Sequence, residues 1–178
     1  HYALPQHIAR LLHRLNCSSL KYTVDLGCGT GLCGIVLREL SHYLTGVDIS
    51  AKMLAQANNK GIYDKLVEAE LISFLQQGKP SYQLAVAADV LPYLGELNTL
   101  FAAVQKRLAN EGLFIFTHEI SEAQPWKLQE SARFSHHPDY IKALCEQHGF
   151  QILAQEKVVA RQQEQQGVEV MLYAAEKM

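Results

Sequence analysis

A glycine-rich segment near the N-terminus constrains the fold of this chain more than any other feature. Its sequence, Val24-Asp-Leu-Gly-Cys-Gly-Thr-Gly-Leu-Cys-Gly34, lies between a β-rich run over 22–26 and apolar residues at helical spacing over 32–40. Glycines at such a junction let the backbone turn tightly and let a ligand touch it, while the first helix amides attract an anionic group. A turn that needs only positive φ is the alternative, but four glycines in eight positions favour a nucleotide-type ligand.

The rest of the chain alternates between strand and helix patterns. Helices are expected over 5–15, 32–40, 50–60, 71–76, 97–108 and 138–148, and strands over 22–26, 43–47, 65–68, 83–87, 113–116, 150–159 and 168–175. Only the polar run 161–167 separates the last two strands, so they must pair antiparallel. The pattern predicts an α/β, Rossmann-like fold: a seven-stranded, mostly parallel sheet with helices on both faces and a C-terminal antiparallel hairpin. Its ligand should lie at the carboxyl ends of the strands.

Asp48 stands at such a strand end, in Gly46-Val-Asp-Ile-Ser50. An acid about 20 residues beyond a glycine loop can hydrogen-bond both hydroxyls of a ribose, so the ligand is predicted to be a nucleoside. The alternative for Asp48 is a cap on the following helix. Ser50 is better placed for that cap.

Length and charge limit what the chain can bind. Its 178 residues, 48% of them hydrophobic, suit a single compact domain over 1–178, and the start at His1 rather than Met leaves open a truncated N-terminus. Lys and Arg number 16 against 18 Asp and Glu. Without a positive field to hold a polyanion, nucleic acid is not expected as a partner, and a small-molecule acceptor fits better. The oligomeric state is left open.

Location and metal content follow from short patterns. No apolar run approaches the roughly 20 residues of a membrane span, and no signal segment opens the chain. The four cysteines form no CxxC motif, which favours free thiols in a reducing cytoplasm. His136-His137-x-Asp139 resembles a metal motif, but adjacent histidines point differently and a third ligand is missing, so no metal is expected.

The segments VDLGCGTG at 24–31, GVDIS at 46–50 and AADVLPYL at 87–94 resemble class I S-adenosylmethionine-dependent methyltransferases, and the resemblance covers nearly the whole chain. It implies S-adenosylmethionine as cofactor and S-adenosylhomocysteine as product. Arg133-Phe-Ser-His136, with Tyr140, is also similar to a branch of predicted methyltransferases associated with tetratricopeptide repeats. Such repeats do not occur in this sequence.

The resemblance assigns roles along the cofactor. Asp25 would face the amino group of the methionine moiety, with the backbone of the glycine loop against that moiety, and Asp89 would lie beside the sulfonium. Asp48 would bind the ribose, and Ile49 and Met53 would sandwich the adenine. Glu70 would accept the adenine amino group, with a solvated acid at a helix start as the alternative. The predicted cofactor-binding set is Asp25, Gly27, Cys28, Gly29, Gly31, Asp48, Ile49, Met53, Glu70, Leu71 and Asp89.

Two other functions stay open. Gly29-x-Gly31-x-x-Gly34 satisfies the dinucleotide fingerprint, which would make the chain an NAD-dependent oxidoreductase. Asp25 argues against this function, because a carboxylate there repels two phosphates but suits a ligand with ammonium and sulfonium charges. The other alternative is a non-catalytic module that binds S-adenosylmethionine, since methyl transfer needs little beyond holding the nucleophile in line.

The acceptor pocket is expected in the loops after the strands over 83–87 and 113–116, because the cofactor should occupy the loops of the first three strands. The candidate substrate-binding residues are Tyr93, His118, Glu119, Arg133, His136 and His137. An arginine and three histidines in one region predict an anionic group on the acceptor, held by Arg133. His118 and His136 are the candidates for a general base.

Overall fold

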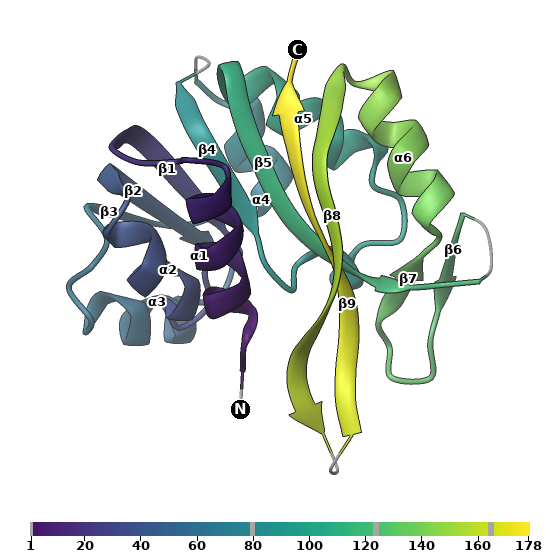
Figure 1. The fold of residues 1–178 in the computed structure, drawn as a ribbon. Coiled ribbons are helices and arrows are strands. Elements are labelled where there is room, and N and C mark those ends of the chain that lie inside the picture. Colours follow the sequence, from purple (N-terminus) through teal and green to yellow (C-terminus); the bar gives the residue numbers. More distant parts are fainter. Residues whose placement is uncertain (1, 79–80, 123–124, 164–165) are drawn as a thin grey trace.

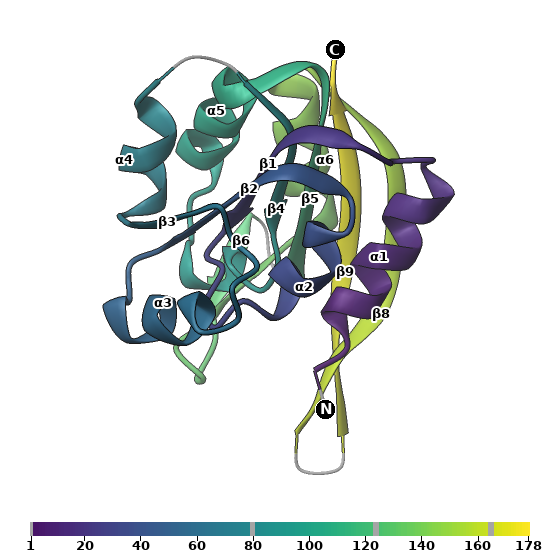
Figure 2. The ribbon, with the colours of Figure 1, turned by 90° about the vertical axis from the view of Figure 1, so that its left-hand side faces the viewer.

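In the computed structural model, the described residues 2–78, 81–122, 125–163 and 166–178 form a β-sheet with helices on both faces (Figure 1, Figure 2). The helices are α1 (Leu4–Arg14), α2 (Leu32–Arg38), α3 (Ala51–Asn58), α4 (Leu71–Gln76), α5 (Asn98–Arg107) and α6 (Pro138–Gln147), with a 3₁₀ turn, η1 (Leu91–Tyr93). The strands are β1 (Leu20–Leu26), β2 (Ser41–Asp48), β3 (Lys65–Glu68), β4 (Tyr82–Ala87), β5 (Leu108–Ile120), β6 (Trp126–Leu128), β7 (Phe134–His136), β8 (Phe150–Gln163) and β9 (Gln166–Lys177). Every predicted helix is present.

The main sheet confirms the predicted topology. Strands β3, β2, β1, β4 and β5 lie side by side in that order and are all parallel. Strand β9 pairs antiparallel with β5, and β8 pairs antiparallel with β9. The sheet therefore has seven strands, mostly parallel, and ends in the expected antiparallel hairpin.

Strict alternation along the strands divides the core into two layers. Phe114 and Phe116 of β5 join the side chains of α4, α5 and α6 on one face, while Ile115 between them joins α1 and α2 on the other. Figure 2 shows α4 and α5 on one side of the sheet and α1 and α2 on the other. Both layers bury large aliphatic and aromatic side chains, as a sheet covered on both faces requires.

Three strands, β5, β8 and β9, are clearly longer than predicted. The strand expected over 113–116 is β5. It begins earlier than predicted, because its pairing with β4 starts at Leu108, shifts in register, and resumes at Leu113. Glu111, with φ +58°, and Gly112 lie in this irregular stretch. The loop expected over 161–167 is largely strand, since β8 and β9 remain paired as far as Gln163 and Gln166, and the two residues between these lie outside the described ranges.

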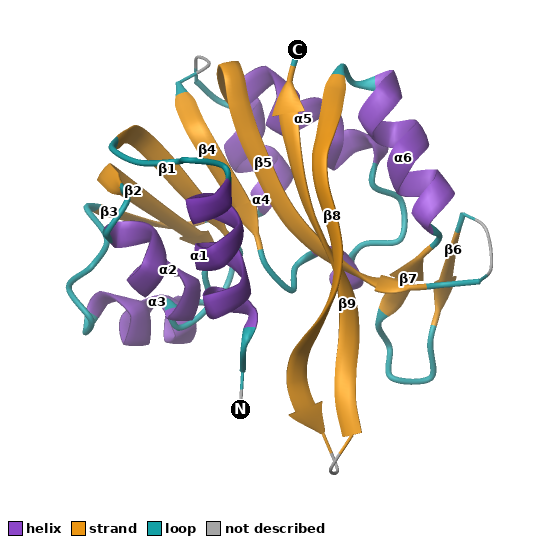
Figure 3. Cartoon of the chain, viewed as in Figure 1, coloured by secondary structure: helices purple, strands orange, loops and turns teal. Residues whose placement is uncertain are grey.

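The segment between β5 and α6 holds a small hairpin that the sequence patterns did not predict. Strand β7 pairs with the last residues of β5, and β6 pairs antiparallel with β7. Figure 3 shows this hairpin and the long β8–β9 hairpin as strand pairs that project from the same end of the sheet. That end carries the carboxyl ends of the parallel strands, where a ligand of such a sheet binds.

Candidate functional site

Two adjoining cavities lie where β1, β2 and β4 end, and both touch Gly27, Asp48, Met53, Asp89 and Tyr93. The first, of about 210 Å³, is lined by Tyr2, Asp25, Gly27, Cys28, Gly29, Thr30, Leu32, Cys33, Asp48, Met53, Ala88, Asp89 and Tyr93. The second, of about 430 Å³, is lined by Gly27, Asp48, Ile49, Ser50, Met53, Ala69, Glu70, Leu71, Asp89, Val90, Tyr93 and Leu94. All the predicted cofactor-binding residues except Gly31 line one cavity or both.

The glycine loop brings bare backbone to the cavities. Gly27 has φ +66°, and a Cβ there would lie 2.5 Å from Cγ2 of Val90 in the loop after β4. Gly29 has φ +53° and faces Met53, with a Cβ position 3.5 Å from the sulfur. Gly31, by contrast, is the left-handed N-cap of α2 and lines neither cavity, so its place in the structure differs from the predicted contact.

Asp48 ties the glycine loop to the end of β2. Its Oδ2 accepts the backbone N–H of Gly29 at 2.9 Å, and its Oδ1 accepts that of Ser50 at 2.8 Å. The hydroxyl of Ser50 in turn accepts the N–H of Met53 at 3.3 Å, so Ser50 is the N-cap of α3. Each Asp48 oxygen keeps a lone pair, which can accept a ligand hydroxyl on the side of the cavities.

Asp25 is buried below the glycine loop and pairs with Tyr63, a residue that the sequence analysis missed. Only 1% of Asp25 is exposed, and the Tyr63 hydroxyl donates to its Oδ2 at 2.7 Å. Burial raises the pKa of Asp25 to about 7, although the Tyr63 hydrogen bond opposes that rise. A Cβ on Gly34 would collide with the Tyr63 ring. A glycine inside a predicted helix, at position 34, was therefore the sequence signal that a bulky side chain packs against this helix.

This pKa predicts how affinity for a cationic ligand depends on pH. Below about pH 7 the Asp25 carboxyl is protonated, so a ligand ammonium loses its counter-charge there. Affinity should fall as the pH drops from 7 to 5.5, by at most about tenfold per pH unit. Calorimetry in this range, below the ligand's own α-amino pKa of about 7.7–8.0, checks the expectation. Asp25→Asn should flatten the profile, and an equally steep profile in that variant contradicts the role of Asp25.

The second cavity has the apolar walls expected of an adenine site. Ile49 is 72% exposed and Met53 is 45% exposed, so a ligand between them would cover large apolar surface. Glu70 is the N-cap of α4, accepting the N–H groups of Ile72 and Ser73 at 3.0 and 2.8 Å. Burial acts to raise the pKa of Glu70, but these donors bring it below the usual value. The structure thus has the helix-start acid that was the alternative, and the adenine contact stays a prediction.

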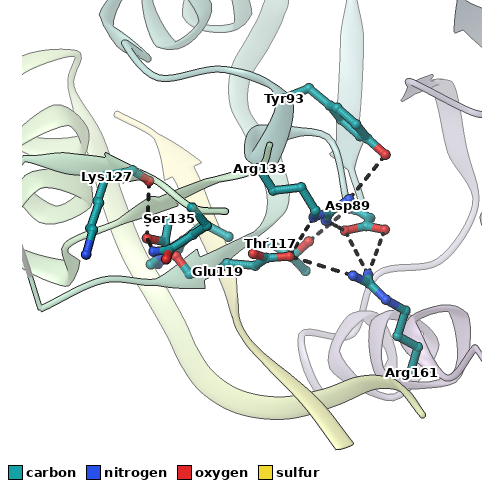
Figure 4. A network of polar contacts seen from close by, with 10 residues as sticks. Asp89, Tyr93, Thr117, Glu119, Lys127, Arg133, Ser135 and Arg161 are labelled. Atoms are coloured by element: carbon teal, nitrogen blue, oxygen red, sulfur yellow. Dashed lines mark hydrogen bonds and ion pairs between the residues drawn. The ribbon is translucent and has the colours of Figure 1, made fainter. Parts of the chain in front are cut away.

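A network of four charged side chains closes the other side of the cavities (Figure 4). Arg133 pairs with Asp89 and, at 2.7 Å, with Glu119, and its Nη1 donates to the Tyr93 hydroxyl at 3.1 Å. Arg161 reaches Asp89 at 3.2 Å and Glu119 at 3.8 Å. The network joins the loop after β4 to β5 and to both hairpins, and its four formal charges cancel.

Arg133 is therefore not the free cation that the sequence predicted for an anionic acceptor. Its side chain is only 14% exposed, and its guanidinium is committed to two carboxylates. Burial acts to lower the pKa of Arg133, but Asp89 and Glu119 raise it above the usual value. An acceptor anion would have to compete with both carboxylates, which the sequence could not reveal because Asp89 lies 44 residues away.

Replacing Arg133 should affect stability. Arg133→Ala leaves Asp89 and Glu119 with Arg161 as their remaining cation, and we expect a loss of about 1–3 kcal/mol in the free energy of unfolding. Urea denaturation followed by circular dichroism measures it. Arg14→Ala, which removes the exposed pair with Glu156, is the control and should cost less than about 1 kcal/mol. Equal losses in the two variants would show that the network around Arg133 stabilises the fold no more than an exposed ion pair does.

The histidines also lie elsewhere than predicted. His118 and His136 are fully buried, and neither lines either of the two cofactor cavities as far as the structure describes them. Burial lowers the pKa of His118 to about 4 and also lowers that of His136, whose Nε2 bonds the Leu94 carbonyl at 2.9 Å. His137 caps α6 by accepting the N–H of Asp139 at 3.1 Å. None of the three lines the two cofactor cavities. Tyr93 alone, of the predicted acceptor residues, does so within the described lining.

The fold and the cavities define an α/β domain for a nucleoside ligand that carries positive charge. A family model described as "Methyltransferase domain" matches residues 24–114, just over half of the chain. The chain belongs to this family and is a class I S-adenosylmethionine-dependent methyltransferase. This result decides against the NAD-dependent oxidoreductase.

Known relatives and structures resemble the chain to different extents. It is 28% identical over 100 residues to the 18S rRNA (guanine(1575)-N(7))-methyltransferase of Saccharomyces cerevisiae, covering 56% of this chain and 36% of that protein. It is 39% identical over 91 residues to the 18S rRNA (guanine-N(7))-methyltransferase of Mus musculus, covering 49% and 31%. The chain thus spans under half the length of these curated relatives.

Among solved structures, the Burkholderia thailandensis 1,6-didemethyltoxoflavin-N1-methyltransferase, with bound 1,6-didemethyltoxoflavin and S-adenosylhomocysteine, superposes with a TM-score of 0.79 at 19% identity, covering 99% of this chain and 79% of that one. The magnesium protoporphyrin IX methyltransferase of Synechocystis PCC 6803, with bound S-adenosylmethionine, has a TM-score of 0.76 at 18% identity, covering 98% and 78%. At such identities the likeness concerns the fold.

Proposed function

We propose that this chain transfers the methyl group of S-adenosylmethionine to a small, uncharged acceptor that enters beside Asp89 and Tyr93. The observation that carries the proposal is the charge of the joined cavities. Their described lining includes the acids Asp25, Asp48 and Glu70 but neither lysine nor arginine, and its fourth acid, Asp89, is paired with Arg133 and Arg161. Acids suit the ammonium and sulfonium charges of the cofactor and repel an anionic acceptor. An anion-bearing acceptor held by Arg133 is not proposed, because Arg133 is already paired.

Each cofactor group has a fitting partner. Bound S-adenosylmethionine would supply a methyl group that is already activated. Asp48 would accept the ribose hydroxyls, and Asp25 would balance the ammonium group. Ile49 and Met53 would hold the adenine between apolar surfaces, with Glu70 at its edge. The bare backbone at Gly29 leaves room for the methionine moiety.

The acceptor should attack through a lone pair that is free at neutral pH. His118 and His136 do not reach the cavities, so the chain offers neither as a base for an alcohol nucleophile. An aromatic ring nitrogen needs no such base, and positioning alone can then supply most of the rate. The names of two similar proteins specify methylation at nitrogen, N1 of a toxoflavin precursor and N(7) of guanine. Both agree with a heteroaromatic nitrogen as the acceptor atom.

An acceptor screen tests this proposal. Formation of S-adenosylhomocysteine is measured with uncharged nitrogen heterocycles, with their carboxylated analogues, and with a guanosine-containing RNA oligonucleotide. We expect turnover of uncharged heterocycles and weaker turnover of the carboxylated ones. Preference for the carboxylated compounds contradicts the charge argument. Preference for the oligonucleotide would favour an RNA substrate, the second candidate, which the rRNA-methylating relatives support.

A motif near the β6–β7 hairpin bears on which branch of the family the chain belongs to. Arg133 and His136 of the shared motif both hold the loop after β4, through Tyr93 and through the carbonyl of Leu94, and the hydroxyl of Tyr140 accepts the N–H of Leu97 at 2.9 Å. On the motif residues themselves, we propose membership of the branch associated with tetratricopeptide repeats. The two core layers share one sheet, which supports a single domain over 1–178.

The cellular location stays a proposal as well. None of the described helices is long and apolar enough to cross a membrane. The four cysteines are all free thiols. Free thiols are typical of a reducing compartment, and on that ground we propose the cytoplasm.

A further inference from the structure

A groove away from the cofactor cavities lies along α4 and α5, which are side by side in Figure 2. Its volume is about 540 Å³, and it shares no described lining residue with either cofactor cavity. The groove is lined by Leu75, Gln76, Gly78, Asn98, Thr99, Ala102, Ala103, Lys106 and Arg107. With small side chains alone, this groove would be an ordinary gap between helices. The burial of the charged Arg107 in its wall distinguishes it from such a gap.

Arg107 is a buried cation without a counter-charge among the described residues. It is 8% exposed, and its guanidinium lies over two aromatic rings, 5.5 Å from the centre of Phe74 and 5.1 Å from that of Tyr82. Its Nε is buried without a hydrogen-bond partner. Arg38 and Arg133, by comparison, each pair with a carboxylate. Burying an unpaired charge is costly, so an anionic ligand that contacts the guanidinium from the groove would be favoured.

The surroundings confine the guanidinium. It packs over the rings of Phe74 and Tyr82, and a Cβ on Gly78 would lie 2.8 Å from its Nη1. Gly78, with φ +91°, therefore leaves room beside the edge that carries the donors. A guanidinium held in advance loses little freedom when it binds a planar or tetrahedral oxyanion.

The rest of the groove offers donors of the same kind. Lys106, the exposed neighbour of Arg107 in the chain, also lines the groove, and Gln76 and Thr99 add an amide and a hydroxyl. The described lining contains neither Asp nor Glu. Glu111, which follows Arg107 closely in the chain, forms no ion pair with it among the described residues, and Glu96, at the other end of α5, accepts the N–H of Asn98 and the hydroxyl of Thr99.

We propose that the α4–α5 groove is a second ligand site, in which Arg107 and Lys106 bind a small molecule through a phosphate or carboxylate group. Both groups present the oxygen pair that a guanidinium recognises in two-point contact. The site is separate from methyl transfer, and its occupant is an oxyanion rather than the cofactor or the acceptor.

Calorimetry on the whole chain tests this site with inorganic phosphate and, in a second arm, with citrate. Ionic strength is held constant, and saturating S-adenosylhomocysteine blocks the glycine loop. We expect saturable binding of at least one anion. Lys106→Glu, which places a carboxylate next to Arg107, should weaken it at least about tenfold. Lys142→Glu, on the exposed side of α6, makes the same charge change and should leave it intact.

Arg107→Gln is the direct variant and should abolish binding. If it fails to fold, because Arg107 is packed between two rings, Lys106→Glu decides the question alone. Phosphate binding with citrate excluded assigns a phosphate ligand, and the reverse assigns a carboxylate. Absence of saturable binding of either anion, or equal binding by Lys106→Glu and Lys142→Glu, overturns the proposal.

Discussion

Gly29→Val is expected to weaken S-adenosylmethionine binding by about 100-fold or more. The φ of +53° found there is strongly unfavourable for a β-branched residue. The methyl groups of valine would also occupy the space where ligand and backbone must meet. Both effects act on the loop that Asp48 holds from the other side. Calorimetry with the parent and the variant measures the change.

Gly61→Val is the matched control for this substitution. Gly61 also has positive φ, +64°, but nothing lies within 4 Å of its Cβ position and it lines neither cofactor cavity. It should show the backbone strain as a lower melting temperature while keeping affinity for the cofactor. If Gly29→Val binds the cofactor as tightly as Gly61→Val does, the glycine loop is not the binding surface.

Asp48→Ala is expected to cost about 1.5–3 kcal/mol of cofactor affinity, or roughly 10- to 150-fold in Kd. The carboxylate would accept the ribose hydroxyls, and it also fixes Gly29 and Ser50, so its loss loosens the loop as well. Asp48→Asn retains one carbonyl oxygen and should lose less. Equilibrium dialysis with labelled S-adenosylmethionine compares the variants.

Asp64→Ala separates binding from stability in that experiment. Asp64 also accepts a backbone N–H of β2, from Leu44 at 2.7 Å, and it pairs with Arg38, but it lines neither cavity. Its loss should lower the melting temperature and leave cofactor affinity unchanged. Parent-like affinity in Asp48→Ala would show that the ribose role is wrong.

The fold could be predicted because its signals are local and strong. Glycine stops, the Ser50 cap and the alternation of strands and helices all lie within short windows, and each predicted helix was found. The β6–β7 hairpin was missed because its strands have three residues each, too few for a period to show. The extent of β8 and β9 was underestimated because polar residues in a projecting hairpin resemble a loop.

The residues predicted to bind the cofactor lie together in the structure, apart from Gly31, whereas those predicted for the acceptor do not. Asp25 and Asp48 follow from strand ends, but the ion pairs of Arg133 form with Asp89 and Glu119, which come from separate parts of the chain. The buried position of His118 could have been predicted from the sequence. It continues the alternation of Phe114 and Phe116 on a buried face of β5, which argues for a core position rather than a base.

The most direct test of the central claim is calorimetric titration of the chain with S-adenosylmethionine, S-adenosylhomocysteine and NAD under identical conditions. The acids Asp25 and Asp48 favour a ligand with ammonium and sulfonium charges over one with two phosphates. We predict saturable one-to-one binding of the first two ligands and much weaker binding of NAD. Binding of NAD as tight as that of S-adenosylmethionine would contradict the assignment of this site.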